Sequence, residues 1–132
     1  MGAEPWDYFV PYEEDIQAAL EKLQEREFRA GRFNGSEFRP ASIDEARDMA
    51  DADGTRSILD IDRIGDEPDY GVVVPLSSEQ LIELYGTDQP TREMIEEELD
   101  LYEDIERGQG VYVIAWKDGK PSEIFFGGYS YD

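Results

Sequence analysis

The chain has 132 residues, a length that suits one domain with a sizeable core. It contains no cysteine and no histidine, which excludes disulfides and thiolate nucleophiles and removes the commonest general base and zinc ligand. Its 33 acidic and 12 basic residues give a formal net charge of -21, so its surface repels nucleic-acid phosphates and attracts basic proteins.

The N-terminal residues predict a strand followed by a helix. Apolar and aromatic residues alternate over 6–10, and Pro11 ends this short strand. A helix follows, with the acidic residues 13–15 in its first turn and Gly31 just beyond its end.

Residues 31–41 have the composition of a loop, which we expect Phe33 and Phe38 to anchor to the core. A capping sequence then begins at Ser42 and predicts a short helix to about Asp51.

Two strands and a turn are expected in the middle of the chain. Residues 57–61 are strand-like, residues 70–74 form a β-branched run, and the glycine, proline and acidic residues at 65–69 are typical of a turn. We therefore predict a hairpin here.

The second half predicts two more helices and a second hairpin. The capping residues Ser77 and Gln80 begin a two-turn helix before Gly86, and a longer acidic helix runs from about Thr91 to Arg107. Strong strands at 111–116 and from Glu123 to about Phe126 flank a tight turn at Asp118–Gly119, with a bulge expected at 127–128.

This order of elements predicts an α+β fold in a single domain, residues 1–132. We expect a mainly antiparallel sheet of about five strands, formed by two hairpins and the N-terminal strand and packed by about four helices.

The acidic helix carries the most distinctive pattern in the chain. Helical spacing places six carboxylates on one face, with apolar residues on the opposite arc. This face could dock a basic partner, and we name it the acidic stripe: Glu93, Glu96, Glu97, Asp100, Glu103 and Asp104. An alternative is that the acidity is an adaptation to high salt, although that explanation favours dispersed acids over a local concentration.

The best candidate for a metal site is Asp51, Asp53 and Asp60. With Gly54, these residues fall on the third, fifth, sixth and twelfth positions of a loop that resembles a calcium loop of the EF-hand family. The resemblance implies Ca²⁺ or Mg²⁺ binding. It is incomplete, because Met49 stands at the first position, and the alternative is that Asp53–Gly54 simply ends a helix.

Three further clusters have both a structural and a functional interpretation. Asp60 and Asp62 would share one face of a strand, as an acid–base or magnesium pair requires. Aromatic residues crowd the terminal strands, where a core is the simpler explanation than a ligand pocket. Four arginines lie among phenylalanines, where they could stabilise the end of the first helix or meet the acidic stripe of a second copy: Arg26, Arg29, Arg32 and Arg39.

No phosphate-binding loop, serine-hydrolase motif or other catalytic motif is present in the sequence. We therefore expect a non-enzymatic interaction module without a cofactor, such as an inhibitor, an immunity protein or a nucleic-acid mimic, that docks a basic protein. The alternative is a small divalent-cation protein or enzyme that uses the aspartates. The absence of a signal-like leader and of a long apolar run predicts a cytoplasmic protein that binds neither membrane nor nucleic acid directly.

Overall fold

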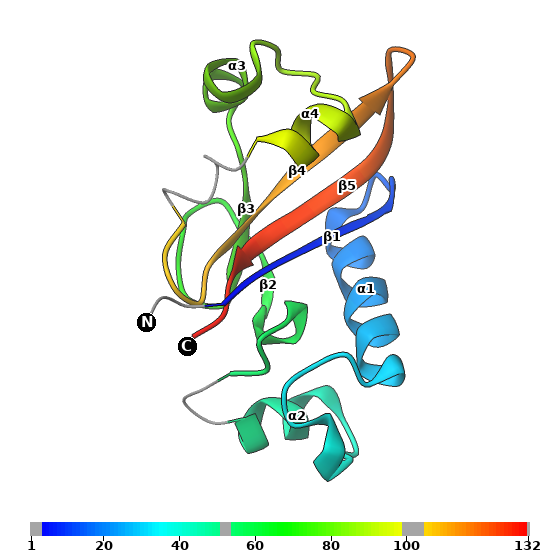
Figure 1. The fold of residues 1–132 in the computed structure, drawn as a ribbon, viewed down its shortest axis with the longest axis vertical. Coiled ribbons are helices and arrows are strands. Elements are labelled where there is room, and N and C mark those ends of the chain that lie inside the picture. The colour runs from blue at the N-terminus through cyan, green and yellow to red at the C-terminus, as the bar shows by residue number, and fades with distance from the viewer. Residues whose placement is uncertain (1–3, 51–53, 99–104, 132) are drawn as a thin grey trace.

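The computed structural model describes residues 4–50, 54–98 and 105–131 (Figure 1). These residues form a five-stranded sheet in the order β1-β5-β4-β3-β2. The strands are β1 (Pro5–Pro11), β2 (Arg63–Ile64), β3 (Val72–Pro75), β4 (Gly110–Lys117) and β5 (Lys120–Tyr129).

The sheet is mixed. β1, β5 and β4 pair antiparallel, whereas β3 pairs parallel with both β4 and β2. The α+β class is confirmed, but the expectation of a mainly antiparallel sheet is wrong. In particular, the predicted hairpin over 57–74 is absent, because β2 and β3 run in the same direction.

The described residues include four α-helices and two 3₁₀ turns. The helices are α1 (Ile16–Ala30), α2 (Ile43–Ala50), α3 (Ser78–Tyr85) and α4 (Arg92–Glu97), and the 3₁₀ turns are η1 (Ser36–Phe38) and η3 (Ile58–Asp60).

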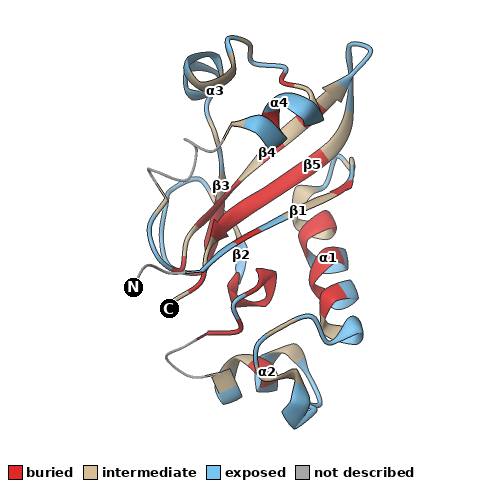
Figure 2. Cartoon of the chain, viewed as in Figure 1, coloured by how far each residue is buried: buried red, intermediate tan, exposed pale blue. Residues whose placement is uncertain are grey.

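One face of the sheet packs against α1 and η3. Alternate residues of β1 and β5 point to this side, as the two-residue period of a strand requires. Figure 2 shows the buried positions along β5 and on one side of α1. The cluster includes Trp6, Val10, Leu20, Leu23, Ile58, Leu59, Ile61, Val73, Ile124 and Phe126.

The opposite face packs against α3 and α4. Ile95 of α4 is buried with residues that alternate along β4, together with Phe125 of β5. Pro90 holds the segment before α4 to the sheet, because its carbonyl accepts a hydrogen bond from the Trp116 amide at 2.8 Å.

The first helix begins later than predicted. Asp15 is its N-cap and accepts a hydrogen bond from the Ala18 amide at 3.0 Å, so residues 13 and 14 precede the helix. The predicted end is confirmed: Gly31 has a φ of 70°, the left-handed conformation that a glycine adopts without steric cost.

The predicted strand at 57–61 is wrong, because this segment contains η3. The Ser57 hydroxyl accepts from the Leu59 amide, and the Gln24 side chain donates to the carbonyls of Ile58 and Ile61. Donors from α1 thus replace the strand partner that these carbonyls would otherwise need.

The predicted acidic helix is also shorter than expected. α4 ends at Glu97, and Glu98 has extended dihedrals of -96° and 111°. Acidic side chains at the C-terminal end oppose the helix dipole, and Glu93 and Glu97 repel each other across one turn. The six carboxylates therefore do not share one face of a continuous helix; Asp100, Glu103 and Asp104 lie outside the described residues.

Two smaller expectations also differ from the structure. Phe33 packs against the core, but Phe38 is 66% exposed and does not anchor its loop. The β4–β5 register shifts between Ala115 and Trp116, where Ser122 of β5 is the extra residue, whereas residues 127–128 of the predicted bulge pair regularly.

Candidate partner-binding groove

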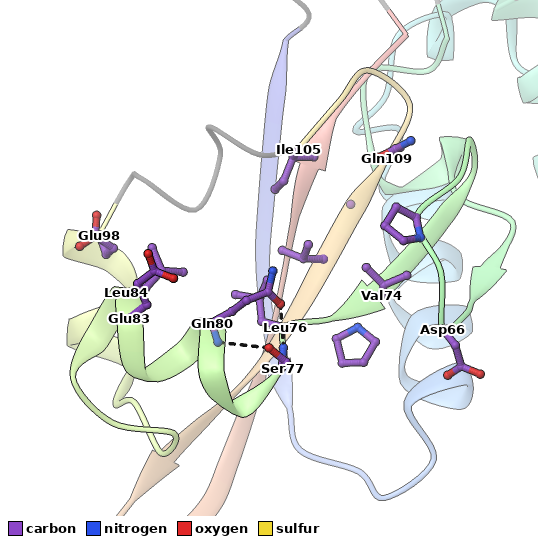
Figure 3. Close-up of a pocket in the computed structure, with 14 residues that line it drawn as sticks. Asp66, Val74, Leu76, Ser77, Gln80, Glu83, Leu84, Glu98, Ile105 and Gln109 are labelled. Atoms are coloured by element: carbon purple, nitrogen blue, oxygen red, sulfur yellow. Dashed lines mark hydrogen bonds between the residues drawn. The ribbon is translucent and has the colours of Figure 1, made fainter.

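A cavity of about 690 Å³ opens between α3 and the sheet edge where β3 ends and β4 begins (Figure 3). We call this cavity the α3 groove. Fourteen described residues line it: Asp66, Pro68, Val74, Pro75, Leu76, Ser77, Gln80, Glu83, Leu84, Glu98, Ile105, Gln109, Gly110 and Val111.

The groove follows from the local chain path. β3 ends at Pro75, which has no amide hydrogen to continue a ladder, and Leu76 leads directly into the Ser77 cap of α3. This path leaves apolar side chains of β3, β4 and α3 beside an opening.

The α3 helix is only partly covered by the rest of the protein. It contains no buried residue, whereas α1, α2 and α4 each bury at least one. Leu81, Leu84 and Tyr85 are half-buried against the sheet cluster, and Ile82 is 53% exposed. α3 therefore has apolar surface left for another molecule.

The charged side chains that line the groove in the described residues are all negative. Its described lining includes the carboxylates Asp66, Glu83 and Glu98 and contains neither lysine nor arginine. In Figure 3, Glu83 and Glu98 lie on the helical side, and Asp66 lies on the opposite side, in the loop after β2. A cationic group is the ligand that such a field attracts.

The N-terminus of α3 does not reverse this preference. Its capping box is complete: the Ser77 hydroxyl accepts from the Gln80 amide at 3.1 Å, and the Gln80 side chain accepts from the Ser77 amide at 2.9 Å. These amides are occupied and offer no hydrogen bond to an anion, although helix N-termini often bind one.

Tyr85 adds a neutral hydroxyl on the same side of the sheet. Burial, helped by the charge of Glu98, raises the pKa of Tyr85 to about 12. The phenol thus stays protonated at neutral pH.

Comparison with protein-family models, with curated proteins and with solved structures gave no match.

The structure describes three members of the predicted acidic stripe, all on α4. Glu93 and Glu97 are exposed, one helical turn apart. Glu96 instead pairs with Arg92, which also binds Glu123 at 2.9 Å and lies over the Phe9 ring at 4.4 Å. Arg92 therefore neutralises part of the stripe and holds α4 on the sheet.

The sequence did not reveal the two carboxylates at the ends of the groove, Asp66 and Glu83. Asp66 falls in a segment identified only as a turn, and α3 was recognised by its apolar residues and its capping box. The one available sequence signal for an acidic surface on α3 was the spacing of Glu79 and Glu83, one helical turn apart. Nothing in the local sequence indicates that α3 lies beside the 66–68 loop.

Of the aspartates considered as metal or acid–base residues, the structure describes Asp60 and Asp62. Asp60 is buried, and its Oδ1 accepts hydrogen bonds from the Thr55 amide at 2.6 Å and hydroxyl at 2.8 Å. Asp62 is largely exposed and pairs with Arg47 at 3.2 Å. The expected Asp60–Asp62 pair on one strand face is therefore wrong, because η3 replaces the strand.

Asp51 and Asp53 of the predicted calcium loop lie outside the described residues. Among the residues that are described, no group of three or more acidic side chains is arranged to hold a metal ion. Burial raises the pKa of Asp60, against the effect of the Thr55 hydrogen bonds.

Three of the four arginines singled out in the sequence form local ion pairs. Arg26 and Arg32 both bind Glu27, and Arg29 binds Glu25 one turn away. These contacts support the structural interpretation of the cluster.

None of the helices in the described part of the chain is long and apolar enough to cross a bilayer.

Proposed function

We propose that this protein is a non-enzymatic interaction module that binds a basic partner protein at the α3 groove. The observation that carries the proposal is the groove itself, a cavity lined by both apolar and polar side chains, whose described lining includes carboxylates and has no basic side chain. An inhibitor or immunity protein that covers the nucleic-acid groove of a basic enzyme would use such a surface, with carboxylates in place of phosphates.

The acidic surface of the protein and the apolar lining of the groove have different roles in this mechanism. The net charge of -21 attracts a basic partner over a distance and speeds association, an effect that salt weakens. The apolar lining then supplies short-range affinity, because its burial removes apolar area from water. Glu93 and Glu97 of α4 extend the acidic surface beyond the groove.

The chemistry of the chain supports binding over catalysis. Without histidine and cysteine, proton transfer or nucleophilic attack would depend on carboxylates, lysines, tyrosines or unsupported hydroxyls. The groove offers carboxylates and amides but no described lysine. We accordingly assign it no reaction.

The test is capture of a partner with a groove variant and a matched control. In the variant Asp66→Lys/Glu83→Lys, two exposed acids of the groove are reversed. The control Glu37→Lys/Asp48→Lys reverses the charge of two exposed acids, one on η1 and one on α2, and has the same net charge as the groove variant. Proteins retained from native extract are identified by mass spectrometry, and each candidate is then purified and its affinity measured.

We expect a basic protein that binds the wild type and the control, but binds the groove variant at least about tenfold more weakly. Equal affinity for both variants would contradict a groove-specific site and leave only non-specific attraction. The same affinity at low and moderate salt would contradict the electrostatic mechanism.

A further inference from the structure

The α3 groove combines an apolar centre with charge at its ends. Val74, Leu76 and Val111 come from the sheet side, and Leu84 comes from α3. In Figure 3, Glu83 and Asp66 lie on opposite sides of Val74 and Leu76, with Ser77 and Gln80 between them. A ligand that fits this pattern needs an apolar middle and a cationic group toward each end.

The cavity is large enough to hold more than one side chain of a ligand. Its volume of about 690 Å³ is well inside the range of sites that enclose whole small ligands. A single arginine or lysine would leave most of the apolar lining in water. A short peptide segment can fill the centre with one residue and reach both carboxylates with its neighbours.

We propose that the groove recognises a short segment of the partner in which one large aliphatic residue is flanked on both sides by arginine or lysine. The aliphatic side chain packs on Val74, Leu76 and Leu84, and the flanking cations pair with Glu83 and Asp66. This proposal rests on the proposed function and specifies the chemistry of the partner.

Each part of the segment has a separate energetic role. The cations contribute little net affinity on an exposed rim, because water and salt screen the pairs. The aliphatic residue increases affinity about tenfold or more if it becomes fully buried. Specificity for the segment therefore depends on its centre.

The proposal is tested with two synthetic peptides and the intact chain. One is acetyl-Arg-Arg-Leu-Arg-Arg-amide, and the other has serine in place of leucine. Binding to the wild type, the groove variant and the matched control is measured by isothermal titration calorimetry, at about 50 mM and about 150 mM NaCl. Circular dichroism verifies that both variants are folded.

We expect the leucine peptide to bind the wild type and the control about tenfold more tightly than the serine peptide, and the groove variant to lose this binding. Equal binding of the two peptides, still lost in the groove variant, would overturn the apolar anchor and leave the proposed function standing. Binding that the groove variant retains would overturn both. Failure of the leucine peptide to bind would overturn the segment proposal alone if a purified basic partner binds in a groove-dependent manner.

Discussion

Glu27 is a buried carboxylate held by two arginines at the end of α1. It accepts hydrogen bonds from Arg26 at 3.0 Å and from Arg32 at 3.0 and 2.7 Å. The hydrogen bonds from Arg32 are the main reason that the pKa of Glu27 is lowered, against the effect of burial. The folded protein therefore favours the charged form of this side chain.

Replacing Glu27 with glutamine should reduce stability by about 2 kcal/mol at neutral pH, since the arginines lose a charged acceptor and are themselves half-exposed. A lowered pKa contributes stability above the ordinary glutamate value, and this contribution disappears as pH falls through the folded pKa. The difference between wild type and variant should thus shrink in acid. Urea unfolding at about pH 7 and about pH 3 measures it.

Glu25→Gln is the matched control, because the Glu25–Arg29 pair is exposed on the same helix. It should change stability by less than about 0.5 kcal/mol. An equal loss of stability in the two variants would show that the burial of Glu27 does not strengthen its ion pairs.

These two pairs also show what sequence can predict at the level of a residue. The Glu25–Arg29 pair follows from sequence spacing alone, because residues four apart in a helix are neighbours. The Glu27–Arg32 pair does not, because Arg32 lies beyond the helix and returns only after the left-handed turn at Gly31. Local spacing does not encode that return.

At the level of elements, α4 is a short helix with one buried side chain, Ile95. Ile95 is 2% exposed and belongs to the cluster on β4, whereas its neighbour Met94 is 39% exposed. Six residues form too little helix to be stable alone, so its position depends on packing.

Ile95→Ala should destabilise the protein by about 3 kcal/mol, because it removes buried methyl groups and leaves a cavity beside β4. Met94→Ala should change stability by less than about 0.5 kcal/mol. Thermal and urea unfolding of both variants test this difference. Similar effects at the two positions would mean that α4 is not fixed by Ile95.

Elements with their own end signals could be predicted from the sequence, and elements defined by distant contacts could not. α3 begins and ends where Ser77, Gln80 and Gly86 place it. The segment 57–61 resembled a strand in its sequence, but hydrogen bonds from Gln24 of α1 stabilise it as η3. α4 stops early, where acidic repulsion outweighs the apolar spacing that predicted a longer helix.

At the scale of the whole molecule, a net charge of -21 must affect folding as well as binding. Repulsion among carboxylates opposes the compact state, and added salt screens it. If the acidity serves partner binding, raising NaCl from about 0.05 M to about 0.5 M should increase the free energy of unfolding by only about 1 kcal/mol. Urea titrations followed by circular dichroism measure the change. A gain of several kcal/mol would favour the explanation of salt adaptation.

The sheet order lay beyond sequence reasoning for a physical reason. Local sequence patterns identified β1, β4 and the start of β5 as strands. They contain no information on which strand lies next to which, so the parallel pairs of β3 with β4 and β2 were missed. The groove depends on this pairing, since the end of β3 and the start of β4 form its floor.

The outer strands of the sheet have a consequence for the behaviour of the protein at high concentration. β1 begins and ends with proline, which has no amide hydrogen to offer a new strand, and carries the exposed charge of Asp7. β2 has two residues, and the Gln17 side chain accepts the hydrogen bond from its Ile64 amide at 2.9 Å. Neither edge is a good template for another chain, so this fold resists polymerisation by strand addition even where charge repulsion is screened.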